Sequence, residues 1–249
     1  MSTNAAEVST LDTEIIRLKE LFTRQKDAYR KAPMPSAEQR IGHLKALKNV
    51  TLKFQNQLAE AVNEDFSCRS KDETLIAEIL TSIEGINMAI KKTRKWMKPS
   101  NRGVGLLFAL AKNEVRYQPL GVVGIIVPWN YPIFLAIGPL VAALSAGNRA
   151  MIKMSEFTPN LNKVFKAMIA EAFDENRVCV IEGEADAAIA FTEQPFDHML
   201  FTGSTTVGRF VMAAAAKNLT PVTLELGGKS PAIVSNNISM KDAAERICF

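Results

Sequence analysis

This sequence has little net charge, few cysteines and few aromatic residues. Its 30 basic and 26 acidic residues leave a net charge of only +4, and aromatic residues make up 7% of the chain. The basic cluster at residues 91–95 ends a predicted helix and has no interleaved aromatics, so helix-dipole complementation explains it better than nucleic-acid binding. Cys68, Cys179 and Cys248 are too widely spaced for a metal site, and the simplest setting for them is a reducing cytoplasm.

One long run, residues 119–148, lacks charged residues and raises the question of a transmembrane span. Three prolines and Asn130 divide this run into a strand over residues 122–127, a turn and a helix that ends near Gly147. The run therefore predicts part of an α/β core and no membrane span. The polar residues 1–14 also lack the charged-then-apolar pattern of a signal peptide.

Apolar residues recur at helical spacing in the first third of the chain. Ile15, Leu18 and Phe22 predict a first helix, and Ser36 with Gln39 forms the capping box of a second helix that continues through Asp65. A third helix is predicted from isoleucines at alternating steps of three and four: Ile76, Ile79, Ile83, Ile86 and Ile90. These helices are expected to pack against a sheet.

Strand and helix patterns alternate through the remainder of the chain. Further strands are expected at residues 151–153, 178–181 and 199–201, with helices at 161–173 and 209–217. This alternation predicts an α/β fold, with a Rossmann-like parallel sheet connected by helical crossovers. The sheet is preceded by the N-terminal helices and interrupted by a β-hairpin.

The predicted hairpin pairs residues 104–110 with residues 114–117. An isolated hairpin is marginal in water and exposes strand edges, so this one is expected to pair with something outside the local chain. An ordinary surface hairpin is the alternative.

A strand that ends near Phe201 is followed by Gly203, Ser204, Val207 and Gly208, and then by the predicted helix over residues 209–217. Free backbone N–H groups and the helix dipole favour a phosphate at such a turn, and glycine lets the backbone approach closely. The spacing is not the common G-x-G-x-x-G fingerprint, so the turn by itself proves little.

Glu225 interrupts an apolar strand directly before two glycines, within T-L-E-L-G-G-K-S. At this point the sequence resembles the aldehyde dehydrogenase superfamily. The family's F-T-G-S-x-x-x-G coenzyme turn and its E-L-G-G-K segment around a general-base glutamate both occur here at the family's separation. The turn P-W-N-Y-P around Asn130 also matches a family motif, and residues 153–159 resemble K-P-S-E-x-T-P with Met154 in place of the first proline.

The resemblance implies a role for each of these positions. Asn130 would donate a hydrogen bond to the developing oxyanion, and Glu225 would act as general base. Without the linked motifs, Asn130 would be only a turn residue and Glu225 a structural acid. The residues implied to bind the coenzyme are Ile126, Pro128, Trp129, Lys153, Glu156, Gly203, Ser204, Val207, Gly208 and Leu226.

Lys153 and Glu156 are implied to bind hydroxyls of the adenosine ribose. A carboxylate near the 2′ position would repel an added phosphate, which favours NAD, whereas Lys153 could tolerate NADP. Without the downstream turn, the pair would be an exposed Lys/Glu pair in a loop. No metal is expected.

The implied reaction is oxidation of an aldehyde to a carboxylic acid through a cysteine thioester. In the family the nucleophilic cysteine lies further beyond the base than Phe249 does, and Cys248 is expected to belong to the core face of a helix capped by Ser239. The chain is therefore expected to be the first half of an NAD-dependent enzyme and to be inactive alone. The alternative is a stand-alone dinucleotide-binding module without turnover.

The implied division assigns residues 1–98 and 120–226 to an NAD-binding domain and residues 99–119 to an oligomerisation hairpin. Residues 227–249 would begin the catalytic domain. The full-length enzyme is expected to form a dimer or tetramer. The motif sequences of this chain are most similar to the coniferyl-aldehyde and fatty-aldehyde branch of the family. In that family the helix after Asn130 helps to form the substrate tunnel, where Gly138 would leave room for an aromatic or long-chain aldehyde.

Overall fold

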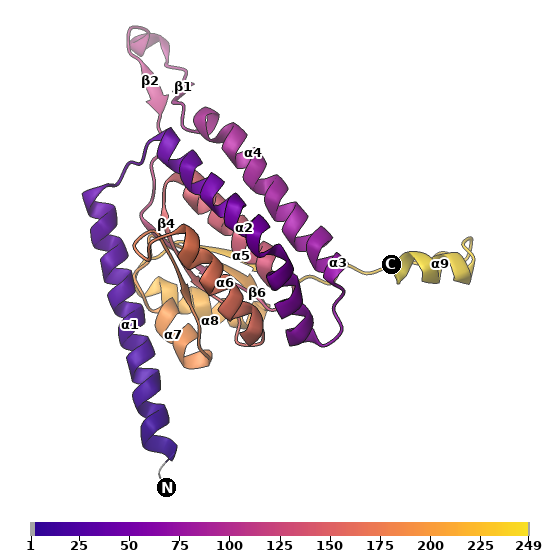
Figure 1. The fold of residues 1–249 in the computed structure, drawn as a ribbon. Coiled ribbons are helices and arrows are strands. Elements are labelled where there is room, and N and C mark those ends of the chain that lie inside the picture. Colours follow the sequence, from indigo (N-terminus) through magenta and orange to yellow (C-terminus); the bar gives the residue numbers. More distant parts are fainter. Residues whose placement is uncertain (1–2, 249) are drawn as a thin grey trace.

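The computed structural model describes residues 3–248, and the side chains of residues 13–248. Five parallel strands form a central sheet with helices on both faces (Figure 1). The strands are β1 (Ser100–Arg102), β2 (Asn113–Val115), β3 (Val122–Ile126), β4 (Arg149–Lys153), β5 (Val178–Ile181), β6 (His198–Gly203) and β7 (Val222–Leu226). The helices are α1 (Thr3–Lys31), α2 (Ala37–Phe66), α3 (Lys71–Glu73), the π-helix η1 (Thr74–Leu80), α4 (Thr81–Trp96), the 3-10 helix η2 (Leu106–Phe108), α5 (Pro132–Ala146), α6 (Pro159–Ala172), α7 (Ala185–Thr192), α8 (Thr205–Ala216) and α9 (Met240–Ile247).

The order of strands in the large sheet is β5-β4-β3-β6-β7, and all neighbours in it are parallel. The chain begins in the middle at β3, adds two strands on one side, and then adds two on the other. Numbered in chain order, this arrangement is 3-2-1-4-5, which is the strand order of the doubly wound fold without its sixth strand. The predicted α/β, Rossmann-like parallel sheet is therefore confirmed.

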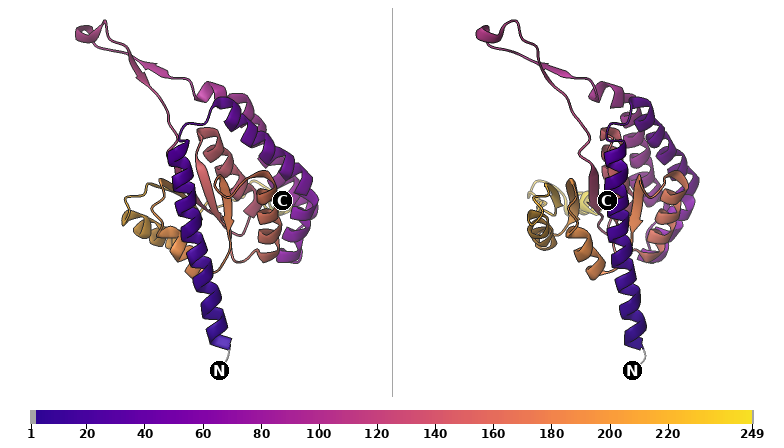
Figure 2. Two further views of the ribbon diagram at one scale, coloured as in Figure 1. Left: turned by 60° about the vertical axis from the view of Figure 1, so that its left-hand side comes forward. Right: turned by 90° about the vertical axis from the view of Figure 1, so that its left-hand side faces the viewer.

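Helices cover both faces of the sheet (Figure 2). Alternate side chains of the strands enter two separate cores beneath them. Val123 and Ile125 of β3 pack with helices α2, α4, α5 and α6 on one face. Val122 of the same strand packs with α1, α7 and α8 on the other face, where Phe22 and Phe196 meet edge to face at 5.1 Å. Because both faces are covered, β3 and β5 contain only apolar residues, as expected of strands in a parallel sheet.

The uncharged run at residues 119–148 forms β3, a turn and α5, as predicted. Pro132 occupies the first turn of α5, and Gly147 ends the helix in the left-handed conformation, with φ 91°. Within the described residues, no helix is long and apolar enough to cross a membrane.

The N-terminal helices form as predicted, with one error of phase. The capping box is present: Gln39 N donates to Ser36 Oγ, and Ser36 N donates to Gln39 Oε1. Ile79 and Ile86 are buried, but Ile76 is 64% exposed. The π-helix η1 explains this difference, because Ile76 lies within it and the wider turn shifts Ile76 out of phase with α4.

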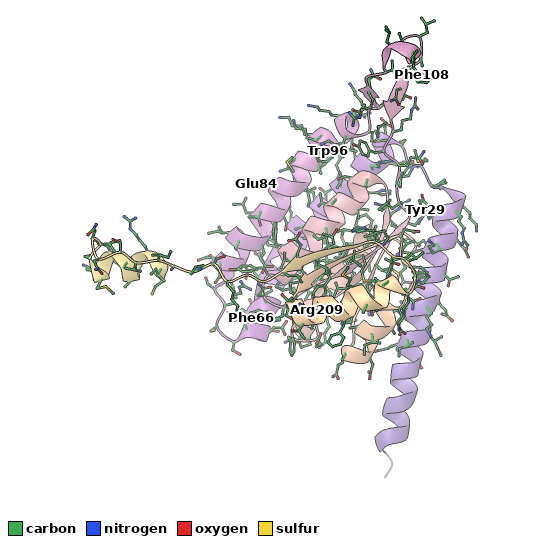
Figure 3. The ribbon with its side chains drawn as sticks, turned by 180° about the vertical axis from the view of Figure 1, so that it is seen from behind. Tyr29, Phe66, Glu84, Trp96, Phe108 and Arg209 are labelled. Carbon is green, nitrogen blue, oxygen red and sulfur yellow. The ribbon has the colours of Figure 1, made fainter. Side chains whose placement is uncertain are left out.

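The hairpin exists, but its first strand was predicted at the wrong place. β1 pairs antiparallel with β2 through Ser100↔Val115 and Arg102↔Asn113, so the strand precedes residues 104–110. Those residues contain η2 and lie at the projecting tip, where Phe108 is labelled in Figure 3. With no neighbouring strand to accept the backbone hydrogen bonds of residues 104–110, the chain turns back through i→i+3 bonds instead.

Candidate active site

Every predicted site residue lies at or just beyond the carboxyl end of a strand of the large sheet. Because the strands are parallel, these ends share one edge. β3 lies between β4 and β6, so the direction in which strands are added reverses between β3 and β6. Ligands of open α/β sheets bind in the crevice at such a switch point. Ile126 pairs with Phe201 across it, which places the turns after β3 and β6 side by side.

The turn after β6 is shorter than predicted. α8 begins at Thr205, so Val207 and Gly208 belong to its first turn and not to a loop before residue 209. Ser204 is the N-cap, and Val207 N donates to its Oγ at 3.3 Å. A capping serine starts a helix at the following residue, and the interpretation of residues 203–208 as one loop overlooked this signal.

Two backbone N–H groups at the start of α8, those of Thr205 and Thr206, have no hydrogen-bond partner in the described part of the chain. They point with the positive end of the helix dipole toward the carboxyl edge of the sheet. A phosphate is the natural acceptor for such a pair.

Gly203 is required by the packing of the protein itself. A Cβ atom at position 203 would lie 2.5 Å from Cζ of the buried Phe201 ring and would displace it. One at position 208 would lie 2.9 Å from Cδ2 of Leu226, but this side chain is partly exposed and its end can move.

Lys153 is the last residue of β4 and is only 2% exposed. Its Nζ donates to the Met154 carbonyl at 2.7 Å, and burial lowers its pKa against the opposing effect of Glu156 and Glu182. Glu156 is exposed just beyond the strand. A ribose hydroxyl that reached Lys153 would have to share or replace the bond to Met154.

The turn after β3 carries Pro128, Trp129 and Asn130 at the entrance of α5. The Asn130 side chain is exposed and has no hydrogen-bond partner among the described residues, whereas its backbone carbonyl accepts from Arg69 Nη1. The Trp129 ring lies 5.9 Å from the Phe66 ring. The backbone of this turn is therefore held while the Asn130 amide stays free for a ligand.

Glu225 lies in β7, the edge strand of the sheet. It pairs with Thr202, and its neighbour Leu226 pairs with Gly203. Glu225 and Leu226 are both exposed. The candidate base is thus one strand away from the candidate phosphate turn.

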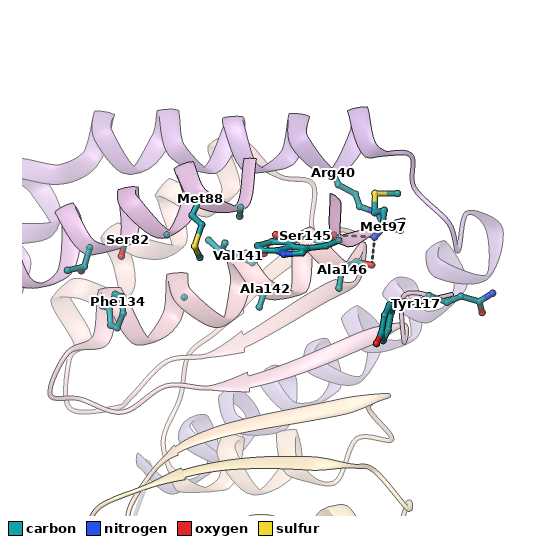
Figure 4. A pocket seen from close by; sticks show the side chains of 16 residues that line it. Arg40, Ser82, Met88, Met97, Tyr117, Phe134, Val141, Ala142, Ser145 and Ala146 are labelled. Carbon is teal, nitrogen blue, oxygen red and sulfur yellow. Dashed lines mark hydrogen bonds between the residues drawn. The ribbon is translucent and has the colours of Figure 1, made fainter. Parts of the chain in front are cut away.

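An apolar groove of about 620 Å³ lies between α4 and α5 (Figure 4). Met88 of α4 and Phe134 of α5 line it, together with Gly138. A Cβ atom at Gly138 would meet nothing within 4 Å, so this glycine enlarges the groove without being needed for backbone packing. Arg40 closes one end by donating to the carbonyls of Ser145 and Ala146.

Comparison with known proteins agrees with this geometry. A model of the aldehyde dehydrogenase family matches residues 3–249. The chain belongs to the aldehyde dehydrogenase family.

Two relatives within the aldehyde dehydrogenase family are described as acting on one aldehyde. The chain is 58% identical over all its 249 residues to a probable coniferyl aldehyde dehydrogenase of Pseudomonas aeruginosa, and covers 52% of it. It is 42% identical over 231 residues to the coniferyl aldehyde dehydrogenase of Pseudomonas sp. strain HR199, covering 93% of this chain and 48% of that one. The chain therefore spans about half the length of these curated relatives.

Two solved structures of aldehyde dehydrogenases share the fold. The substrate-bound state of Staphylococcus aureus AldH superposes with a TM-score of 0.88 at 38% identity, over 92% of this chain and 50% of that one. PnpE in complex with nicotinamide adenine dinucleotide gives a TM-score of 0.73 at 28% identity, over 84% and 42%.

The cysteines of this aldehyde dehydrogenase chain differ from expectation. Cys179 is buried, and burial raises its pKa to about 12, as expected of a structural thiol. Cys248 and Cys68 are exposed, so the assignment of Cys248 to a core face was wrong. Ser239 does cap α9, but only Ala243 of the predicted face is buried, because α9 stands away from the body of the molecule (Figure 1).

Arg69 and Glu78 were missed as parts of the site. Glu78 is fully buried, yet it lies within an apolar helical pattern that was assigned to packing alone. Its carboxylate accepts from Ile133 N at 2.7 Å and from Phe134 N at 3.1 Å at the start of α5. Burial raises the pKa of Glu78. The sequence did carry a signal for Glu78, because an acidic residue among regularly spaced isoleucines is unexpected.

Proposed function

We propose that the protein containing this chain oxidises an aldehyde to a carboxylic acid, with NAD as hydride acceptor and a cysteine thioester as intermediate. The observation that carries the proposal is the common sheet edge, where Asn130 follows β3 while Gly203 and Glu225 lie at the carboxyl ends of β6 and β7. Family membership supports the reaction class, and the NAD complex of PnpE supports the coenzyme.

The residues at the switch point fit a dinucleotide. The free N–H groups of Thr205 and Thr206 suit a pyrophosphate, and the glycine at position 203 removes the side chain that would stand beside it. Ile126, Pro128 and Trp129 would border the other side of the crevice, with Ser204, Val207, Gly208 and Leu226 on the near side. When bound there, the nicotinamide supplies the acceptor for hydride.

Glu156 favours NAD over NADP in this proposal. Its exposed carboxylate lies three residues beyond Lys153, where it would accept a ribose hydroxyl and repel a 2′-phosphate. Lys153 would be the weaker partner for a phosphate, since it is buried and already bonded to Met154.

Asn130 and Glu225 would carry the protein's share of the chemistry in this chain. The Asn130 amide is uncharged, exposed and free of internal partners, so it can donate to an oxyanion without a change of protonation. Glu225 would take a proton from the water that hydrolyses the thioester. We place the nucleophilic cysteine outside residues 1–249.

The substrate is proposed to be an aromatic aldehyde of the coniferyl type or a long-chain aldehyde. Two relatives are described as acting on coniferyl aldehyde, and the groove between α4 and α5, the helix that follows Asn130, is apolar. Open space at Gly138 gives a direct test in the complete enzyme. Gly138→Leu should raise KM for the aromatic aldehyde about tenfold, while KM for a two-carbon aldehyde changes little.

A stand-alone dinucleotide-binding module without turnover is the alternative. The two functions separate in one assay of NADH formation with an aromatic aldehyde. The complete protein should show steady turnover, whereas a mass-verified polypeptide of residues 1–249 should bind NAD without turnover. Steady turnover by this polypeptide that disappears in Cys248→Ala would overturn the placement of the nucleophile. Absence of turnover in the complete protein would favour the binding module.

We further propose a cytoplasmic location, since all three cysteines are unpaired. The complete enzyme is proposed to be a dimer or tetramer that uses the projecting hairpin.

A further inference from the structure

The Arg69 guanidinium lies at the centre of a small cluster beside the turn of Asn130. Its side chain is 8% exposed. Nη1 donates to the Asn130 carbonyl, and Nη2 donates to Glu73 Oε1 at 3.0 Å. The same group lies 4.3 Å from the centre of the Tyr131 ring and 5.0 Å from that of Phe66. Arg69 therefore contacts the turn both by a hydrogen bond and by stacking.

Glu78 holds the other end of the same turn. It lies in the π-helix η1 and is fully buried. Its Oε2 accepts from the backbone of Ile133 and Phe134, the first free N–H groups of α5. Its Oε1 lies 3.8 Å from Arg69 Nη1 and has no hydrogen-bond partner in the described part of the chain. One buried ion pair thus connects the carbonyl of Asn130 to the start of the helix that follows it.

The location of Glu78 in a π-helix is informative. A π-helical turn is rare and is frequently found at functional sites. Here it turns Glu78 into the interior, although the preceding Ile76 is left in solvent. A purely apolar contact at this position would have avoided a buried carboxylate with an unbonded oxygen.

The Asn130 side chain has no partner of its own in the described part of the chain. The backbone of residues 128–132 therefore sets the position from which this side chain extends. We propose that Arg69 is a positioning residue for Asn130, with Glu78 as its anchor. Together they hold the turn so that the amide meets the oxyanion of the aldehyde adduct. This inference rests on the proposed role of Asn130 in aldehyde oxidation.

Steady-state kinetics of the complete enzyme provide the first test. Arg69→Ala should lower kcat about 100-fold with little change in KM, because a misaimed donor loses transition-state stabilisation and not ground-state binding. Added guanidinium should restore part of the loss. Arg69→Lys should not, since an ammonium group cannot donate in a planar fork or stack on Tyr131.

A double variant separates positioning from general destabilisation. In an Asn130→Ala background, Arg69→Ala should cause no further loss of kcat, because there is no donor left to aim. Arg94→Ala is the matched control: it removes an arginine from an exposed ion pair with Glu38 and should leave kcat unchanged. If Arg69→Ala does not fold, Glu78→Gln carries the same test, with a smaller expected loss.

Amide hydrogen exchange of the 249-residue polypeptide tests the clamp without catalysis. Arg69→Ala and Glu78→Gln should accelerate exchange at residues 129–134 and leave β4 and β5 unchanged. Uniform acceleration along the chain, or unaltered exchange at residues 129–134, would refute the clamp, as would full kcat in both variants. If Asn130→Ala itself retains full kcat, the assigned oxyanion donor is wrong, and exchange alone then decides whether Arg69 holds the turn.

Discussion

Gly203 lies directly over the ring of Phe201, and a Cβ atom at position 203 would lie 2.5 Å from the Cζ atom of that ring. This close approach is part of the packing of the protein, because Phe201 is buried in the core beneath α8. The same glycine is the proposed point of closest approach to a pyrophosphate. These two reasons for glycine predict different results when the ring is made smaller.

Gly203→Ala should lower the free energy of unfolding by about 1–3 kcal/mol through overpacking and weaken NAD binding at least roughly tenfold. Adding Phe201→Leu should recover the melting temperature, since leucine lacks the distal ring atoms, but should not recover NAD affinity. Calorimetry and thermal melts measure both. Gly103→Ala is the control, because a Cβ atom there meets nothing within 4 Å. Recovery of both properties together would show that the glycine serves packing alone.

The three thiols should react in two classes. Cys68 and Cys248 are exposed, whereas the pKa of Cys179 is raised to about 12, mainly by burial and further by Glu175. Because the thiolate is the reactive form, a thiol reagent should modify two cysteines in the folded protein and the third only after denaturation. Cys68→Ala and Cys248→Ala should each remove one fast equivalent. Three fast equivalents in the native protein would contradict the burial of Cys179.

His43 should make the protein less stable in mild acid. Burial, assisted by Arg177 and Arg149, lowers its pKa from 6.5 to about 4. Between pH 6.5 and pH 4, His43 is therefore protonated in the unfolded chain and neutral in the folded chain. The free energy of unfolding consequently falls as pH decreases from about 6.5 to about 4. The full shift corresponds to about 3 kcal/mol, and solvent screening of this half-buried ring should reduce the loss to roughly 1–2 kcal/mol.

Urea unfolding across this pH range measures the His43 effect. In His43→Gln, the part of the pH dependence that belongs to this residue should disappear. An identical pH profile in the variant would mean that other groups, such as His198, whose pKa is also lowered by burial, account for the loss.

The projecting hairpin should make the 249-residue polypeptide self-associate. Leu106 and Leu107 are more than nine-tenths exposed, and Leu110 is fully exposed. Such a patch is expected to find an apolar partner. Replacing these three leucines by lysine should lower the association seen in sedimentation, whereas Leu219→Lys, at an equally exposed leucine on the body, should not. A monomer over a wide concentration range would contradict the prediction.

Local chemistry was sufficient to predict much of the fold. Ser36 and Ser239 cap their helices as their sequence context indicates, and Gly147 ends α5 where the apolar pattern stops. These signals depend on a few neighbouring residues. The parallel sheet followed because the alternation of buried strands and helices allows few other arrangements.

Features that depend on distant packing could not be predicted in the same way. Helical phase placed Cys248 on an apolar face, but only contact with another element can bury such a face, and α9 has little such contact. The apolar residues 104–110 have strand-like composition, yet no strand among residues 3–248 pairs with them. The pairing of Arg69 with Glu78 also depends on a π-helix, which ordinary periodicity does not reveal.

Glu225→Gln should separate the two halves of the proposed reaction in the complete enzyme. Attack by the cysteine and hydride transfer precede the step that needs a base, so the variant should release a burst of NADH and then turn over about 100-fold more slowly. Glu225 is exposed on the edge strand, so the substitution should change stability by no more than about 0.5 kcal/mol. Asn130→Ala is the contrasting variant: it should abolish the burst, because the oxyanion forms before hydride leaves. Stopped-flow measurement of NADH distinguishes the two. Loss of the burst in Glu225→Gln would place this residue before hydride transfer and reject its assignment as the base of thioester hydrolysis.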